Sequence, residues 1–266
     1  MSIRLIDGSE FLHIPKTGGT WIHQVLEEQG LIKDVYVGGH EHANYDRVQS
    51  ETHAKKKSKK PRKLTRSLSQ RINRVLPRRQ SAASNRTPTH SEPFRFCFVR
   101  HPLRWYESWW KYMNARGWND WGDPKVAGGW HPNAALNGLG SSDFNQFVQN
   151  VISARPGYVS ELFFSYAKPG IAYIGKTEHL TDDLLSVVSH LGLQVDSQAV
   201  KNRGPVNASK DAGQRIEWDP VLRQTLMRLE LPALVHFGYL EMDDARELGL
   251  ADTLKPASAL QRFASP

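Results

Sequence analysis

The chain has 266 residues, of which 39% are hydrophobic, and a formal net charge of +8 at pH 7. This length fits one domain with an insert, and the single cysteine, Cys97, excludes a disulfide framework or a zinc site of several thiolates. No run of about 18 apolar residues occurs, and the N-terminus lacks the basic and apolar regions of a signal peptide. We therefore expect a soluble, cytoplasmic protein with no transmembrane segment.

The first predicted elements are a short strand, a glycine-rich turn and a helix. Residues 11–14 are apolar and end at a proline, the sequence KTGGT follows, and a helix is predicted from about residue 20 to residue 29. Such a turn leaves backbone N–H groups unpaired at the start of a helix, where they and the helix dipole bind an anion. The lysine, Lys16, precedes both glycines, unlike the Walker A order, so we expect an anion site without a metal ion.

The excess positive charge lies in one segment that follows these elements. Residues 55–86 hold 13 lysines and arginines and no acidic residue, and the rest of the chain is mildly acidic. We therefore treat residues 52–91 as a basic, low-complexity insert that is partly disordered or acts as a lid. Its lysine-rich start repels itself and should be disordered, whereas Leu64, Leu68, Ile72 and Val75 have helical spacing. A polyanion or an anionic surface is the candidate partner of residues 55–86, and improved solubility is the alternative role.

A second strand and helix follow the insert. Residues 94–99 (FRFCFV) are typical of a buried strand, and residues 102–114 predict a helix with proline in its first turn. Arg100 ends the strand, and Ser108 lies about two turns into the helix. If the chain folds back between them, the guanidinium and the hydroxyl can reach one phosphate.

The rest of the chain continues the alternation of strands and helices. The expected elements are a Gly- and Trp-rich loop at 117–141, a helix at 143–153 capped by Ser142, a strand at 171–174, a helix between Thr181 and Gly192, and a helix opened by Asp219 and Pro220. This alternation predicts an α/β fold, with a central parallel sheet covered by helices on both faces.

Two of these stretches resemble the sulfotransferases that use 3′-phosphoadenosine 5′-phosphosulfate (PAPS). HIPKTGGTW, residues 13–21, is similar to their 5′-phosphosulfate-binding loop, and FVRHPLRWYES, residues 98–108, is similar to their 3′-phosphate-binding element. The first motif is closest to the carbohydrate O-sulfotransferases and their bacterial relatives, and residues 174–193 add a weaker match. One departure is that Arg104 follows Arg100 by four residues, where that branch often has an arginine after five. The resemblance implies a P-loop-like three-layer fold and a single sulfotransferase domain over residues 1–266.

The resemblance also implies the reaction and its residues. PAPS would be the donor, without a metal, and the sulfuryl group would move in line to a hydroxyl or amine of an acceptor, for which a carbohydrate is a candidate. Lys16 would stabilise the charge on the leaving nucleotide, as expected for a transfer that depends on positioning and electrostatics. The implied cofactor-binding residues are Lys16, Thr17, Gly18, Gly19, Thr20, Trp21, Arg100 and Ser108. Arg100 and Ser108 would hold the 3′-phosphate, and Trp21 would stack on adenine, although a tryptophan in the first turn of a helix is more often a core residue.

The acceptor side has its own candidates. An acceptor hydroxyl must lose a proton, and a histidine of near-neutral pKa suits this role. The sequence VGGHEHANY offers His40, favoured because relatives frequently carry a histidine after a glycine here, with His42 and Glu41 as alternatives. Six of the eight tryptophans lie between residues 105 and 130, where they could line an acceptor cleft or, for the three on the predicted helix, form core.

Two other functions remain open from the sequence. A nucleotide phosphotransferase of the P-loop class shares the layout, but it needs a hydroxyl after a GK pair to hold magnesium and a partner aspartate at a strand end, and neither is found. A nucleic-acid-binding protein could act through the basic insert, although aromatic residues for base stacking are not interleaved there.

Overall fold

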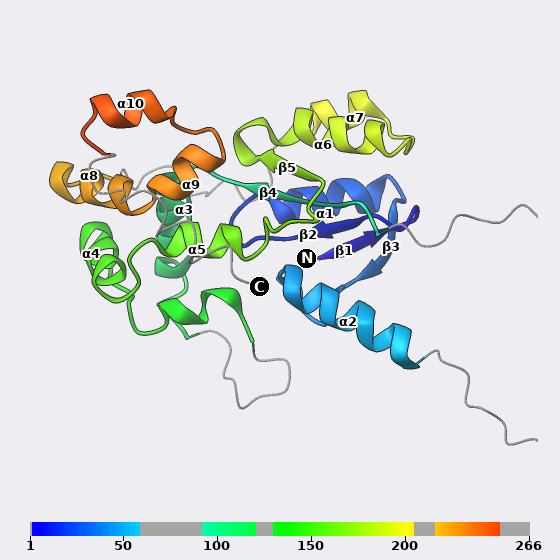
Figure 1. Cartoon of the computed structure of the whole chain (residues 1–266), viewed down its shortest axis with the longest axis horizontal. Helices are drawn as coiled ribbons and strands as arrows, with labels where there is room; N and C mark the ends of the chain where they lie inside the picture. Colours follow the sequence, from blue (N-terminus) through cyan, green and yellow to red (C-terminus); the bar gives the residue numbers. More distant parts are fainter. Residues whose placement is uncertain (1, 59–91, 121–129, 205–215, 251–266) are drawn as a thin grey trace, which may run out of the picture.

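The computed structural model describes residues 2–58, 92–120, 130–204 and 216–250, and for residues 52–58 it describes the backbone alone (Figure 1). Its centre is a five-stranded sheet with the strand order β3-β1-β2-β4-β5. The strands are β1 (Ile3–Leu5), β2 (Glu10–Leu12), β3 (Ile32–Val35), β4 (Arg95–Val99) and β5 (Tyr173–Lys176).

The sheet is mostly parallel rather than wholly parallel as the sequence predicted. β2 pairs with β4, and β4 with β5, in parallel, with Phe11 opposite Phe96 and Phe96 opposite Tyr173. β1, which was not predicted, runs antiparallel to both β2 and β3. The reason is the short connection at residues 6–9, because a parallel crossover needs a dozen or more residues.

Helices cover both faces of the sheet (Figure 1). They are α1 (Gly19–Glu28), α2 (Tyr45–Ser58), α3 (Pro102–Asn114), α4 (Phe144–Ala154), α5 (Tyr158–Phe164), α6 (Leu180–His190), α7 (Ser197–Asn202), α8 (Pro220–Leu229), α9 (Leu231–His236) and α10 (Met242–Glu247), with short 3-10 turns at Pro132–Leu136 and Thr177–His179. Among the described residues, none of these helices has both the length and the hydropathy needed to cross a lipid bilayer.

Alternation along the strands divides the core into two parts. Phe11, Phe96 and Phe98 face α1, α6 and α7, whereas Cys97 and Val99 pack on the other face with α3, α4, α5 and α9. Successive side chains of a strand point to opposite faces, so a continuous apolar run is what a sheet between two helical layers needs. The predicted sheet covered by helices on both faces is therefore confirmed.

Several predicted boundaries are shifted by their local hydrogen bonds. The cap of α4 is Asp143, whose Oδ1 accepts from Gln146 N at 2.7 Å, and not Ser142. The third predicted strand is β5, two residues later than expected, and Thr181 lies inside α6, which follows a 3-10 turn directly. Asp219 caps α8 as predicted, since it accepts from Leu222 N at 2.8 Å.

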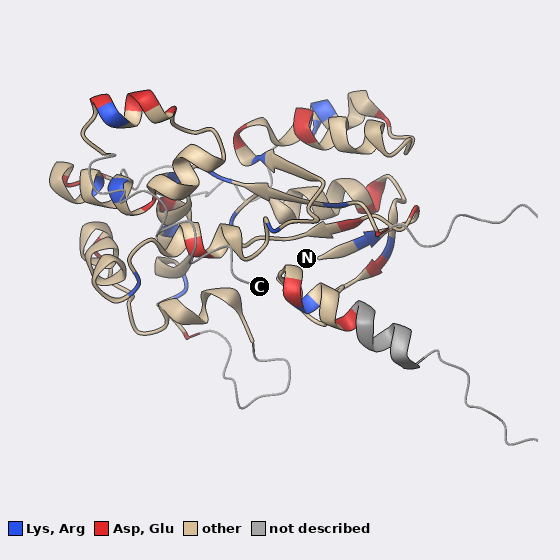
Figure 2. Cartoon of the chain, in the orientation of Figure 1, with Lys and Arg blue, Asp and Glu red and all other residues tan. Residues whose placement is uncertain are grey.

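The basic insert is described only at its beginning. α2 continues to Ser58, so residues 54–58, at the start of the lysine-rich run that was expected to be disordered, lie in a helix; alanine and lysine are good helix formers that extend a helix begun at Tyr45. The remaining predictions for this insert, including the helix at Leu64 to Val75, concern residues 59–91 and lie outside the described residues, as does Trp121. Elsewhere the described basic and acidic residues are interspersed over the elements (Figure 2).

Candidate functional site

The glycine-rich turn connects the end of β2 to the start of α1. Lys16 and Gly18 have φ angles of 66° and 83°, in the left-handed region, on either side of Thr17. Gly18 occupies the N-cap position, and among the described residues no side chain caps the first N–H groups of α1. Backbone N–H groups in such a turn, together with the positive end of the helix, form a concave site for an anion.

Both glycines are required by close neighbours. A Cβ atom at Gly19 would lie 1.9 Å from Cδ2 of His13, and one at Gly18 would lie 2.8 Å from a methyl carbon of Leu180. Gly19, the first residue of α1, therefore lies against the His13 ring. A side chain at Gly18 or Gly19 would have to displace the turn or the neighbouring side chain.

Three consecutive carbonyl groups of the turn are held by donors within the protein. Thr17 Oγ1 donates to Ile14 O at 2.9 Å, Trp105 Nε1 donates to Pro15 O at 2.8 Å, and Arg100 Nη1 donates to Lys16 O at 3.3 Å. These hydrogen bonds engage the carbonyl oxygens, whose partial negative charge would otherwise repel an anion. They also use the proton of the buried Thr17 hydroxyl, which leaves the backbone N–H as the group that Thr17 can offer to a ligand.

Three cationic side chains gather around this turn. Lys16 Nζ lies 4.1 Å from the centre of the Tyr112 ring, and the guanidinium of Arg116 lies 3.8 Å from the same ring. Burial, followed by repulsion from Arg100 and Arg116, lowers the pKa of Lys16 from 10.5 to about 8. Burial also lowers the pKa of Arg100, against the attraction of nearby Glu178. An anion placed here would relieve this repulsion.

Tyr112 and Arg116 were not identified from the sequence. Ser108, Tyr112 and Arg116 are spaced by four residues each, so they lie along one side of α3 and the turn that follows it. Trp105 and Tyr112, which both contact the turn, flank Ser108, and this spacing is the signal that could have revealed them. Ser108 is half-buried on the side of α3 that faces the turn.

The two residues predicted to hold the 3′-phosphate belong to different elements. Arg100 follows β4 and Ser108 lies in α3, and no hydrogen bond joins them within the part of the chain described. Arg104, whose role the resemblance left in doubt, is exposed and pairs with Glu107 at 2.9 Å.

One predicted binding residue is a core residue instead. Trp21 is 4% exposed and packs in the cluster with Leu184 and Val187 of α6. This burial favours the alternative that Trp21 is a core residue over stacking on adenine, because a residue of the first turn of α1 that faces the sheet packs in the apolar layer. Thr20, its neighbour, is exposed at the start of the helix.

The candidate bases lie in a cluster of four histidines. The ring of His42 lies 4.4 Å from that of His13, 5.1 Å from that of His131 and 6.0 Å from that of His40. Burial is the main cause that lowers the pKa of His42 to about 2 and that of His131 to about 4, and it lowers the pKa values of His40 and His13 as well. All four rings are therefore neutral at pH 7.

Hydrogen bonds fix the orientation of two of these rings. His42 Nδ1 lies 3.2 Å from His13 O, and since a carbonyl only accepts, Nδ1 carries the proton and Nε2 carries a lone pair. Nε2 lies 3.5 Å from Glu41 Oε1. His40 Nδ1 accepts from His42 N at 3.0 Å, so its proton is on Nε2. In this arrangement the lone pair of His42 is on the nitrogen nearest Glu41, and the low pKa of His42 makes it a weak base.

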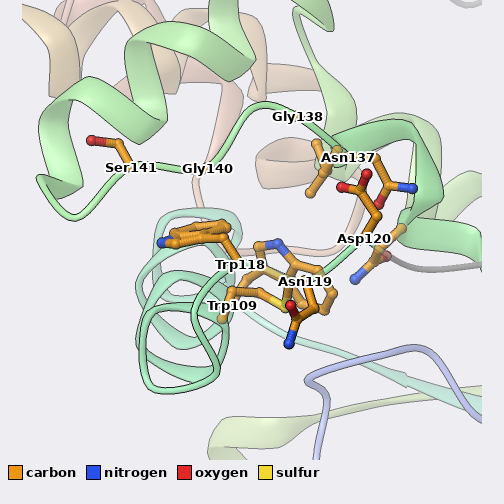
Figure 3. Close-up of a pocket in the computed structure, with 11 residues that line it drawn as sticks. Trp109, Trp118, Asn119, Asp120, Asn137, Gly138, Gly140 and Ser141 are labelled. Atoms are coloured by element: carbon orange, nitrogen blue, oxygen red, sulfur yellow. The ribbon is translucent and has the colours of Figure 1, made fainter.

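A cavity of about 200 Å³ lies beside α3 (Figure 3). It is lined by aromatic, aliphatic, amide and carboxylate side chains, which include Trp109, Met113, Trp118, Asn119, Asp120, Asn133, Leu136 and Asn137. Asn133 is fully buried, and Tyr158 donates to its Oδ1, so that its Nδ2 is turned the other way and has no partner among the described residues. A buried donor of this kind suits a ligand oxygen.

Trp109 links this cavity to the loop and to the histidines. Its ring stacks on Trp105 at 5.7 Å, and it lies 5.9 Å from the ring of Tyr112 and 6.4 Å from that of His131. Trp105 and Trp109 are buried, as one reading of the sequence expected for the helical tryptophans, while Trp118 is partly exposed and lines the cavity.

Comparisons with protein-family models, with curated proteins and with solved structures found no match to this chain. The functional proposal below therefore rests on the residues of this chain, their geometry and the resemblance of its two motifs.

Proposed function

We propose that the protein is a sulfotransferase that moves the sulfuryl group of PAPS to a hydroxyl or amine of an acceptor. One observation carries the proposal: the turn between β2 and α1 has its three carbonyls bonded internally, its helix N-terminus uncapped by a side chain, and Lys16, Arg100 and Arg116 around it. The negative charge of a phosphosulfate would balance the positive charge of these side chains and of the helix N-terminus. The likeness of the two motifs to those of sulfotransferases favours PAPS over other anions.

The reaction proposed is an in-line displacement. The bond between sulfur and the bridging oxygen of the 5′-phosphosulfate breaks, the acceptor oxygen forms a new bond to sulfur, and its proton leaves to a base. Negative charge grows on the bridging oxygen, so Lys16 would turn from the Tyr112 ring toward that atom, and the first N–H groups of α1 would hold the phosphate. The transfer then depends on fixed positive charge at the leaving group.

The nucleotide would extend from this loop toward β4 and α3. Arg100 and Ser108 are the proposed partners of the 3′-phosphate, and Arg116 joins them as a third cation that the sequence did not indicate. Trp21 is removed from the nucleotide site because it lies in the core. A P-loop-like fold is part of this proposal, since the sheet order and the strand-turn-helix unit are compatible with it.

The acceptor would bind in the cavity beside Trp109. Aromatic faces such as Trp118 pack against sugar rings, and Asn133 Nδ2 and the nearby amides suit hydroxyl groups, so a carbohydrate is the proposed acceptor. His40 is the proposed base because it is the more exposed histidine of the pair, although its ring must first release the bond from His42 N. No observation on the described residues favours a phosphotransferase or a nucleic-acid-binding protein.

A transfer assay tests the proposal. The full chain is incubated with PAPS and a panel of mono- and disaccharides, and release of 3′-phosphoadenosine 5′-phosphate is followed. Lys16→Ala should reduce turnover by at least about 100-fold, the size of effect seen when one charge-stabilising group is removed. Lys33→Ala, at an exposed lysine of β3, is the matched control and should keep full activity. Near-normal turnover by a folded Lys16→Ala protein would refute the role of Lys16.

A further inference from the structure

The histidine cluster contains three side chains of types that bind metal ions, and not all of them have a role in the proposed sulfuryl transfer. Glu41, His42 and His131 each present one nitrogen or oxygen atom, and these atoms all lie within 4.8 Å of one another. They come from two distant parts of the chain, the segment after β3 and the N-cap of the 3-10 turn Pro132–Leu136. Two imidazoles and one carboxylate form the ligand set of several catalytic zinc sites.

The orientation of His42 is that of a metal ligand. Its Nδ1 donates to His13 O at 3.2 Å, which leaves the lone pair on Nε2, the atom 3.5 Å from Glu41 Oε1. A histidine that binds a metal commonly donates its other ring N–H to a carbonyl or carboxylate, because this bond fixes the ring and its tautomer. In His42 this bond, from Nδ1 to His13 O, is already formed.

The segment that carries two of the three donors is held firmly. Ser2 N donates to Glu41 O at 2.6 Å, and Tyr166 Oη donates to His42 O at 2.5 Å. His42 is buried, whereas the Glu41 side chain is 41% exposed and has room to turn. Ligands at ~2.0–2.2 Å from a tetrahedral zinc ion are about 3.4 Å apart. Glu41 Oε1 and His42 Nε2 are already at 3.5 Å, and a pair of donors at the limit of 4.8 Å would have to approach by about 1.4 Å.

His131 has to change its hydrogen bonding to join the site. Its Nδ1 accepts from Asn133 N at 3.1 Å, so in the metal-free protein its proton is on Nε2. Coordination through Nε2 requires this proton to move to Nδ1 and the bond from Asn133 to be given up. The ring keeps the same number of protons. The change of tautomer and the loss of the hydrogen bond from Asn133 N are the free-energy cost of metal binding at His131.

We propose that Glu41, His42 and His131 bind a Zn²⁺ ion beside the glycine-rich turn, with one coordination position left for water or a hydroxyl. No metal was predicted from the sequence, because Lys16 precedes both glycines of the turn, unlike the order in a magnesium-binding loop. Fe²⁺ uses the same donor types in six-coordinate sites, but nitrogen and oxygen sites bind Zn²⁺ more tightly than Fe²⁺. When bound, zinc lowers the pKa of a hydroxyl at its open position.

This inference stands apart from sulfuryl transfer, because its ligands and its test concern metal binding alone. The full-length protein is freed of metal with a chelator and titrated with Zn²⁺ by calorimetry and with Co²⁺ by visible absorption. We expect one equivalent of Zn²⁺, and with Co²⁺ the intense absorption bands of a four-coordinate ion. Zinc should also raise the unfolding temperature, as a ligand of the folded state does.

Three variants decide between this site and adventitious binding. His131→Asn keeps a capping side chain and removes the imidazole, and Glu41→Gln keeps the shape of the side chain but removes its charge. Each should weaken Zn²⁺ binding by about 100-fold or more, since loss of a group that only orients a metal ligand already weakens binding by about 10- to 100-fold. His179→Asn, at an exposed histidine outside the cluster, should leave it unchanged. The proposal is overturned if no equivalent of Zn²⁺ binds, if both site variants bind like the wild type, or if His179→Asn weakens binding equally.

Discussion

Lys16 is the residue on which the proposed chemistry depends most. It has a left-handed backbone conformation, contacts the Tyr112 ring, and has Arg100 and Arg116 as its main charged neighbours. Its pKa of about 8 is below the ordinary value of 10.5, so between these two pH values the folded protein binds fewer protons here than the unfolded chain. Without a bound anion, the folded protein is therefore destabilised by the Lys16 ammonium group below pH 8. This destabilisation disappears as the pH rises to 10.5.

The same shift predicts how anion binding depends on pH. Affinity for 3′-phosphoadenosine 5′-phosphate should be constant up to about pH 8 and then fall, by up to about tenfold per pH unit, as Lys16 loses its proton. Calorimetry at a series of pH values measures this decline. In Lys16→Met the affinity should be lower throughout and independent of pH over the same range. A decline of equal slope in the variant would assign the titration to another group.

At the scale of elements, the pairing of β2 with β4 positions the site, since the turn follows β2 and Arg100 follows β4. The two strands are joined at their start by a buried ion pair, in which Arg95 Nε donates to Glu10 Oε2 at 2.8 Å and both side chains are 2% exposed or less. Arg4, which is partly exposed, contacts Glu10 from β1.

Removing one partner of this pair should be costly. Glu10→Ala leaves the Arg95 charge buried and should lower the free energy of unfolding by about 3–5 kcal/mol. Arg4→Ala, which removes a more exposed charge, should cost less than about 1 kcal/mol. Urea unfolding of the two variants measures both values. A loss of less than about 1 kcal/mol for Glu10→Ala would mean that the pair does not hold these strands together.

The elements recovered from sequence were those with strong local signals. The turn and α1, β4 and α3 were placed within one or two residues, because proline, the glycines and continuous apolar runs act locally. β1 was missed, since it is short and becomes a strand only by pairing with its neighbours. Trp21 was assigned to a ligand because the sequence does not reveal which side of α1 faces the sheet.

The candidate site was only partly predictable for the same reason. Lys16, Arg100 and the two histidines after β3 could be named from their motifs, but the approach of His131 and Arg116 depends on how distant segments fold together. The single ring of Tyr112 joins two of these cations, and nothing in its local sequence distinguishes it from a core aromatic residue.

For the whole molecule, charge is divided between a mildly acidic domain and one basic segment. α2 carries the start of that segment away from the sheet (Figure 1). If residues 55–86 attract an anionic substrate, glutamine at the lysines of residues 55–63 should raise the apparent KM about tenfold at low salt while kcat stays unchanged. The difference should vanish at high ionic strength. An equal KM at low salt would leave solubility as the role of these lysines.

The most direct test of the account is calorimetric titration of the full chain with 3′-phosphoadenosine 5′-phosphate, the desulfated donor. The account predicts one binding site with a dissociation constant in the micromolar range, and about tenfold or greater weakening in each of Lys16→Ala, Arg100→Ala and Arg116→Ala, since each removes a charge-assisted contact. Lys33→Ala should bind like the wild type. Absence of binding at about 1 mM nucleotide, or equal binding by all four variants, would contradict the assignment of this turn as a nucleotide site.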